Sequence, residues 1–255
     1  MFVSVKSCLS YNDYNLVAEE SEMSKKIAIM QPYFFPYIGY WQLINSVDTF
    51  VLYDNIQFTK KGWINKNRYL ENGKDKLFSI CIEKDNHLLN VIDRVISPEF
   101  NKKKLLSQLQ NAYAKAPYKK DVLPFLEEVI NFESTNLFDY IHNSIVKTME
   151  YLDIKTQMII SSHIDCNHDL KSSDRVIDIC RSVNASDYIN PIGGVELYDK
   201  QDFKTHGINL YFLKTNDIKY RQFNNEFIPN LSIIDVLMFN SPENIKEMLN
   251  QYVLI

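Results

Sequence analysis

Residues 27–54 read IAIMQPYFFPYIGYWQLINSVDTFVLYD and combine a strand pattern, a turn, a helix pattern and a second strand pattern. Residues 27–30 are a short apolar run that stops at a proline turn, as a buried strand does. Residues 41–44 continue as a helix, and residues 49–54 are rich in β-branched and aromatic side chains. A strand, a helix and a strand within about 30 residues predict a βαβ unit. Its two strands should be parallel neighbours with a right-handed crossover.

Strand and helix patterns keep alternating toward the C-terminus. Further strands are predicted at residues 77–82, 157–162, 187–190 and 208–213, with an Asn72-Gly73 turn before the first of them. Helices are predicted at residues 101–115, 121–132, 136–152, 174–183, 195–198, 232–239 and 242–249. Pro117 and Pro124 are expected to separate the first two helices. The alternation predicts a three-layer, Rossmann-like α/β fold with a parallel sheet and a helical insertion at about residues 100–155.

The chain has 255 residues, of which 45% are apolar or aromatic and 24% are charged, a composition typical of a folded protein. A second methionine, Met23, stands shortly before the first predicted strand. We therefore expect a single α/β domain at residues 23–255. Residues 1–22 are expected to be a disordered N-terminal extension.

The charge and cysteine content indicate which binding partners and which cellular compartment the sequence favours. The 28 Lys and Arg residues against 32 Asp and Glu residues give a net charge of −4, and no basic patch favours nucleic acid. No apolar stretch approaches the ~20 residues that span a bilayer, and no secretory signal is found. The four cysteines lie far apart, as free thiols do. These features predict a cytoplasmic protein.

Tyrosine and phenylalanine are abundant, with 16 and 15 residues against 2 tryptophans. Tyrosine combines a flat apolar face with a hydrogen-bonding tip, which suits a pocket for a sugar ring or a base. The codon usage of an AT-rich genome would produce the same excess.

The densest group of polar and aromatic residues follows the first two strands. Ligands of parallel sheets bind at the carboxyl ends of the strands, so residues 31–36 and 54–61 should share one rim. The helix that begins near Gly39 would present free backbone N–H groups to a phosphate. Alternatively, residues 33–40 are only an apolar lid of the sheet. The predicted substrate-binding residues here are Gln31, Pro32, Tyr33, Phe35, Pro36, Gly39, Tyr40, Gln57, Trp63, Asn65 and Asn67.

Charged residues of the same group are the catalytic candidates. Asp54 ends the second strand and could hold a hydroxyl, an amine or a metal. Lys60 and Arg68 add positive charge suited to a nucleotide-sugar diphosphate or to ATP.

Two later segments supply further substrate-binding candidates. Asp174 could cap the helix that follows, and Arg175 in the first turn opposes the helix dipole, so its partner should be an anionic ligand or Asp54. Asn190, Gly193 and Gly194 follow a predicted strand, where glycines let the backbone approach a ligand or simply form a tight turn.

The histidines do not predict a metal site. His163 and His168 have only Asp165, Cys166 and Asp169 near them in an irregular segment, a weak pattern for zinc. No Ser-His-Asp arrangement, P-loop or GxGxxG motif occurs.

The chain resembles the WbqC-like protein family from about Lys25 to its C-terminus. Residues 27–40, 53–58, 63–68, 174–175, 188–198 and 231–235 carry the resemblance. It implies a bacterial cytosolic protein of surface-polysaccharide gene clusters, such as those for O-antigen or capsule. Members are suspected of transferring glycine or another acyl group to a nucleotide-linked amino sugar.

Residues 27–58 also resemble the opening of pantothenate synthetase and related nucleotidyltransferases with a HIGH motif. Such enzymes activate a carboxylate as an adenylate and pass it to an amine, and ATP is then the cofactor. Here Tyr37 and Tyr40 occupy the two histidine positions of the motif. A neutral tyrosine donates only one hydrogen bond, so adenylyl transfer is not implied by these residues.

Three functions follow from the residues and the resemblances together. The first is an aminoacyl or N-acyl transferase in which Asp54 orients the sugar amine or acts as general base, while Lys60 and Arg68 hold phosphates or stabilise an oxyanion. The second is a non-catalytic protein that binds a sugar nucleotide for a glycosyltransferase or another polysaccharide-biosynthesis enzyme. The third is an ATP-dependent adenylate-forming ligase.

Overall fold

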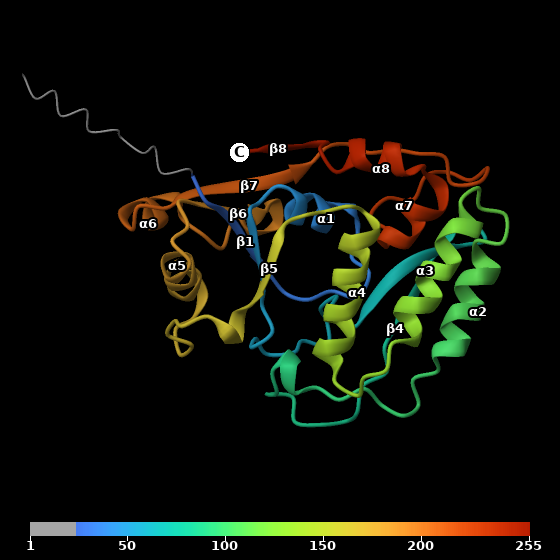
Figure 1. The fold of residues 1–255 in the computed structure, drawn as a ribbon, viewed down its shortest axis with the longest axis horizontal. Helices are drawn as coiled ribbons and strands as arrows, with labels where there is room; N and C mark the ends of the chain where they lie inside the picture. Colours follow the sequence, from blue (N-terminus) through green and yellow to red (C-terminus); the bar gives the residue numbers. More distant parts are fainter. Residues whose placement is uncertain (1–23) are drawn as a thin grey trace, which may run out of the picture.

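The computed structural model describes residues 24–255, so the extension expected at residues 1–22 lies outside the described part. Six strands form one sheet in the order β5-β2-β1-β6-β7-β8, in which only β8 is antiparallel to its neighbour (Figure 1). Their bounds are β1 (Lys26–Met30), β2 (Thr49–Leu52), β5 (Gln157–Ile160), β6 (Asp187–Pro191), β7 (Asn209–Thr215) and β8 (Tyr252–Leu254). The predicted mixed α/β fold with a mostly parallel sheet is confirmed.

The strand order reverses between β1 and β6. From β1 the chain passes through α1 (Ile38–Asn45) to β2 as a parallel neighbour, with Ile27 opposite Thr49, and β5 then adds beyond β2. Later strands β6 and β7 extend the sheet on the other side of β1. The carboxyl ends of β1 and β6 therefore form a topological switch point, where open α/β sheets bind ligands.

Helices cover both faces of the sheet. Ile27 and Ile29 of β1 pack with α5 (Ser172–Ser182) and α6 (Lys200–Thr205), whereas Ala28 belongs to a larger cluster on the opposite face. That cluster includes residues of α1, α4 (Leu137–Tyr151), α7 (Ile233–Phe239) and α8 (Pro242–Met248). Successive side chains of a strand point to opposite faces, which explains the division of β1 between two apolar layers.

The middle of the chain forms a separate group beside the sheet (Figure 1). An antiparallel hairpin of β3 (Lys66–Glu71) and β4 (Lys74–Ser79) packs near α2 (Lys102–Ala112) and α3 (Lys119–Asn131). Asn72 and Gly73 form its turn with φ of 52° and 72°, as a two-residue hairpin turn requires. The predicted break at Pro124 is wrong, because this proline lies inside α3. Because proline has no N–H, the Lys120 carbonyl oxygen lacks its helical hydrogen bond. Lys120 is exposed, so water can bind this oxygen instead.

The segment after β6 also differs from the prediction. Residues 192–194 form a short 3-10 helix, residues 195–197 are a turn, and the helix of this region is α6. Asp199 caps α6, because its side chain accepts a hydrogen bond from the backbone N–H of Gln201 at 2.8 Å. No helix within residues 24–255 is long and apolar enough to cross a membrane.

Candidate functional site

A cavity of about 470 Å³ opens beside the carboxyl ends of β1, β6 and β7. We call it the switch-point pocket. It is lined by Tyr33, Pro36, Tyr37, Trp63, Asn67, Arg68, Ile192, Lys214, Thr215 and Asn230. Its size is within the range of small-molecule sites. Of the residues predicted from sequence, the structure brings Tyr33, Pro36, Trp63, Asn67 and Arg68 together here.

The turn between β1 and α1 forms one wall of the pocket and is held by side-chain hydrogen bonds. Phe35 adopts a left-handed backbone with φ of 46°, which a bulky residue keeps only under strong constraint. The Asn67 amide donates to the carbonyl oxygen of Phe35 at 2.8 Å, and the Ser232 hydroxyl donates to the same oxygen at 2.8 Å. The Phe35 ring is fully buried in the core and does not line the pocket.

Two tyrosines are tied to Gln31 at the end of β1. Tyr40 donates its hydroxyl hydrogen to the Gln31 carbonyl oxygen at 2.9 Å, and Tyr33 donates to the Gln31 side-chain oxygen at 3.2 Å. Burial, with a smaller contribution from Tyr37, raises the pKa of Tyr33 to about 12. Burial also raises the pKa of Tyr40 well above its ordinary value. Both phenols therefore stay neutral at physiological pH, with Tyr33 in the pocket and Tyr40 behind it.

Gly39 in the first turn of α1 faces a side chain of its own segment. A Cβ atom at this position would lie 2.5 Å from the Tyr37 ring, so the ring occupies the space where a bound group was expected. The first turn of α1 has no acidic residue and no side-chain cap. Tyr37, the N-cap residue of α1, lines the switch-point pocket.

Positive charge and an exposed aromatic face meet on the opposite wall. The Arg68 guanidinium lies 5.6 Å from the centroid of the Trp63 ring, which is 42% exposed. Arg68 also pairs with Asp75 at 3.1 Å and donates to the Asn230 carbonyl at 3.2 Å, while its buried Nε has no partner. Lys214 adds a second cation, and no carboxylate lines the pocket. This wall suits an anionic ligand with a flat ring.

Asp54, the predicted general base, lies outside the switch-point pocket. It follows β2, on the side of β1 away from β6, and is fully buried. Its Oδ1 accepts a hydrogen bond from the Ser162 backbone N–H at 2.9 Å, whereas its Oδ2 is buried without a partner. An unsatisfied buried carboxylate oxygen is costly and calls for a specific explanation.

Arg175 in α5 is a buried cation without an acidic partner among residues 24–255. Its guanidinium lies 5.2 Å from the centroid of the Tyr53 ring, and its Nη2 lies 2.8 Å from Nδ1 of His168. The Asn55 amide reaches the same Nδ1 at 3.0 Å. Since Nδ1 accepts from two donors, the His168 proton must be on Nε2, which donates to the Ile164 carbonyl at 3.1 Å. No ion pair joins Arg175 to Asp54.

The remaining predicted residues lie around these two regions or support the scaffold. Pro32 is buried, Lys60 and Gln57 are exposed, and Asp174 is exposed in the first turn of α5. The Asn65 amide donates to the Ile80 carbonyl at 2.8 Å. Asn190 accepts from the Tyr188 hydroxyl at 3.0 Å and packs directly over Gly194, while the space around Gly193 is open.

Sequence reasoning did not select Lys214, Thr215 and Asn230, which line the pocket. Lys214 and Thr215 end a parallel strand, so the same strand-end rule that selected residues 31–36 would have found them. Asn230 has a left-handed backbone with φ of 56° and carries no comparable pattern. No group of three or more His, Cys, Asp or Glu side chains within the described residues is suited to a metal ion.

These features define a mostly parallel α/β protein with a cationic, aromatic-lined pocket at its switch point. Residues 31–247 match the WbqC-like protein family, and the chain belongs to this family. It is 25% identical over 219 residues to an uncharacterized protein of Mycobacterium tuberculosis, Rv1507c. That similarity covers 85% of this chain and 94% of the relative. No solved structure matches the chain at a significant level.

Proposed function

We propose that the protein transfers an aminoacyl or other N-acyl group, such as glycine, to an amino sugar carried by a nucleotide. The observation that carries the proposal is the position of a cationic and aromatic pocket at the switch point of a parallel sheet. In this role it would act in the cytoplasm alongside enzymes that build O-antigen or capsule.

The switch-point pocket has the chemistry that a sugar nucleotide requires. The exposed Trp63 face can stack on a base or a sugar ring. Arg68 and Lys214 can bind the diphosphate, helped by the first turn of α1 once the Tyr37 ring moves aside. The neutral Tyr33 hydroxyl, whose hydrogen is donated to Gln31, can accept a hydrogen bond from a sugar hydroxyl. Lys60 is exposed outside the pocket, so Arg68 and Lys214 take the phosphate role in this proposal.

Asp54 supplies the buried carboxylate that acyl transfer to an amine needs. The sugar amine must lose a proton as its nitrogen forms a bond to the acyl carbon and the donor's leaving group departs. The unpartnered Oδ2 of Asp54 can accept a hydrogen bond from the neutral amine and take that proton as the bond to the acyl carbon forms. For the amino sugar to reach this oxygen from the switch-point pocket, across the end of β1, the side chains that cover Asp54 must move aside.

Incubation of the purified protein with uridine- or thymidine-diphosphate amino sugars, glycine and ATP tests the transfer. Mass spectrometry should show the sugar nucleotide gaining one glycyl group. Acyl thioesters replace glycine and ATP in a parallel set of reactions. No mass gain with any donor across several amino sugars would rule the transfer out.

Arg68→Gln tests the pocket separately from the reaction. We expect the dissociation constant of the sugar nucleotide to rise roughly tenfold or more, because a charge-assisted contact to phosphate is lost. Arg181→Gln removes an equal charge on the exposed side of α5 and is the matched control. Equal effects of the two substitutions would show that the pocket does not bind the phosphates.

A non-catalytic protein that binds a sugar nucleotide is the second candidate. Tyr37 and Tyr40 favour it, because they stand where histidines of related chemistry would act and the pKa of each phenol is raised by burial. Thermal shifts with sugar nucleotides but no turnover would support this role. A shift with ATP alone would instead favour an adenylate-forming ligase.

A further inference from the structure

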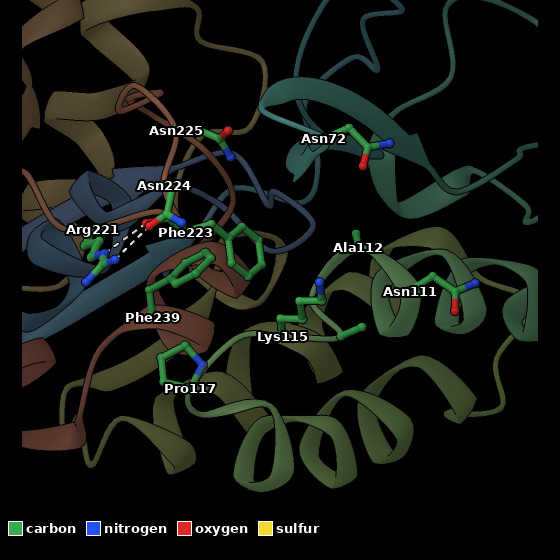
Figure 2. Close-up of a pocket in the computed structure, with 11 residues that line it drawn as sticks. Asn72, Asn111, Ala112, Lys115, Pro117, Arg221, Phe223, Asn224, Asn225 and Phe239 are labelled. Atoms are coloured by element: carbon green, nitrogen blue, oxygen red, sulfur yellow. Dashed lines mark hydrogen bonds between the residues drawn. The ribbon is translucent and has the colours of Figure 1, made fainter.

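A second cavity, of about 920 Å³, lies between α2, the β3–β4 turn, residues 221–225 and α7 (Figure 2). We call it the asparagine-lined cavity. Asn72, Asn111, Asn224 and Asn225 line it, together with Lys115, Arg221, Phe223 and Phe239. It is separate from the switch-point pocket, since the two share no lining residue.

The lining side chains combine three kinds of contact. Each asparagine amide both donates and accepts hydrogen bonds, as sugar hydroxyls do. Phe223 and Phe239 lie edge to face with ring centroids 4.7 Å apart and present an apolar surface. Lys115 and Arg221 contribute positive charge, and no aspartate or glutamate lines the cavity. The cavity thus matches a hydroxyl-rich ring that carries negative charge.

The two cations keep hydrogen-bonding capacity for a ligand. Arg221 donates from Nε to the Phe223 carbonyl at 3.0 Å and from Nη2 to the Asn224 side-chain oxygen at 2.7 Å (Figure 2). These contacts fix the guanidinium and leave Nη1 without a partner among the described residues. Lys115 has no ion pair within residues 24–255 and points toward the centre of the cavity in Figure 2.

One buried carboxylate, Asp235 in α7, holds the walls of the cavity together. Its Oδ1 accepts from the Tyr113 hydroxyl at 2.9 Å. Its Oδ2 accepts from the Tyr220 hydroxyl at 2.7 Å and from the Gln222 amide at 2.6 Å. The Tyr113 hydroxyl also accepts from the Leu70 N–H at 3.0 Å, which links β3 to the same group.

Each partner of Asp235 stands within two residues of a residue that lines the cavity. Tyr113 adjoins Ala112 and Ala114, and Gln222 adjoins Arg221 and Phe223. Asn225 closes the rim, because its side-chain oxygen lies 3.0 Å from where a Cβ of Gly73 would be. Walls fixed by a fully satisfied buried network are what a preorganised binding site requires.

We propose that the asparagine-lined cavity binds a small sugar that carries a negative charge, either a phosphate or a carboxylate. The amides contact the hydroxyl groups, the phenylalanine rings contact the apolar face of the sugar, and Lys115 with Arg221 binds the anionic group. This site is independent of the function proposed for the switch-point pocket.

Calorimetric titration with glucose 6-phosphate, glucuronate, glucose and inorganic phosphate tests the site. We expect one or both anionic sugars to bind at least tenfold more tightly than glucose and than inorganic phosphate. Binding of glucose 6-phosphate alone identifies the anion as a phosphate, and binding of glucuronate alone identifies it as a carboxylate. Inorganic phosphate binding as tightly as both sugars would overturn the assignment to a sugar.

Two substitutions within the cavity and one control outside it test where the sugar binds. Lys115→Gln should weaken binding of the anionic sugar at least fivefold. The control is Lys103→Gln, which removes an exposed lysine of α2 that does not line the cavity and should leave binding unchanged. Asn111→Ala should weaken the sugar but not inorganic phosphate. Equal effects of the two lysine substitutions, or no binding of either anionic sugar at millimolar concentration, would overturn the proposal. Thermal unfolding of each variant confirms that it is folded.

Discussion

Two carboxylates are completely buried, Asp54 just after β2 and Asp235 in the first turn of α7, but their hydrogen bonding differs. Asp235 accepts hydrogen bonds from three side chains, and both of its oxygens are satisfied. Asp54 accepts one bond from a backbone N–H, and its other oxygen has no partner. Asp235 and Asp54 are therefore equally buried, but Asp235 accepts three hydrogen bonds and Asp54 accepts one.

This difference separates a structural role from a functional one. A carboxylate whose oxygens are filled by protein donors joins several segments and has little capacity for a ligand. A buried oxygen without a partner lowers stability and marks a group with capacity left for a substrate. By this criterion Asp235 supports the walls of a cavity, and Asp54 is the candidate for chemistry.

Replacing Asp235 with alanine should have the largest effect on stability. The change leaves buried donors of Tyr113, Tyr220 and Gln222 without an acceptor, and we expect a loss of roughly 3 kcal/mol or more. Denaturant unfolding measures it. Asp217→Ala, which removes an exposed carboxylate paired with Lys219 at 2.8 Å, is the control. Such an exposed pair contributes less than about 1 kcal/mol, so equal losses would contradict the structural role of Asp235.

Asp235→Asn should change how stability depends on pH. Burial raises the pKa of Asp235 above its ordinary value of 3.8, although its three hydrogen bonds oppose the rise. The folded state then holds this proton more tightly than the unfolded state, so its contribution is full below pH 3.8 and falls as pH rises through the folded pKa.

The stability of the natural protein relative to Asp235→Asn should therefore be greatest near pH 4 and decrease toward neutral pH. Parallel urea titrations from pH 4 to pH 8 measure this difference. A difference that grows with pH would show that hydrogen bonding, rather than burial, controls the ionisation of Asp235.

Asp54→Asn should have the smallest effect on stability. The asparagine oxygen can still accept from the Ser162 N–H, and the buried side chain keeps nearly the same size. We expect the free energy of unfolding to stay within about 1 kcal/mol of the natural protein or to rise, while any acyl transfer is lost. A large loss of stability would place Asp54 in the same structural class as Asp235.

Much of the fold follows from local patterns in the sequence. The parallel pair of β1 and β2 was predicted because a complete strand, helix and strand lie within residues 27–54. β3 was missed because four of the six residues in its sequence, KNRYLE, are polar without alternating with apolar ones, and because it gains its contacts from the distant elements α2 and α7. Pro124 was misread as a helix break. A helix tolerates this proline because the carbonyl that loses its hydrogen bond belongs to exposed Lys120, and that exposure is a property of the folded protein.

The candidate site was predictable in part. Tyr33 and Pro36 follow β1, and the strand-end rule alone predicted them at the edge of the sheet where the switch-point pocket lies. The sequence also put Asp54 and Arg68 on one rim, but β1 separates β2 from β6 in the sheet, and Arg68 reaches the pocket from β3. Strand order depends on long-range pairing, which no local pattern records. The partners of Asp235 are equally non-local, since Tyr113 lies 122 residues from it.

The hydrogen bonds of His168 have a consequence for chemical labelling. Reagents such as diethyl pyrocarbonate acylate the imidazole nitrogen that has a free lone pair. In His168 that nitrogen is Nδ1, which is covered by Arg175 and Asn55, while Nε2 faces the Ile164 carbonyl. An exposed histidine is thereby made a poor nucleophile. His87 and His163, which are also exposed, should acquire the label before His168.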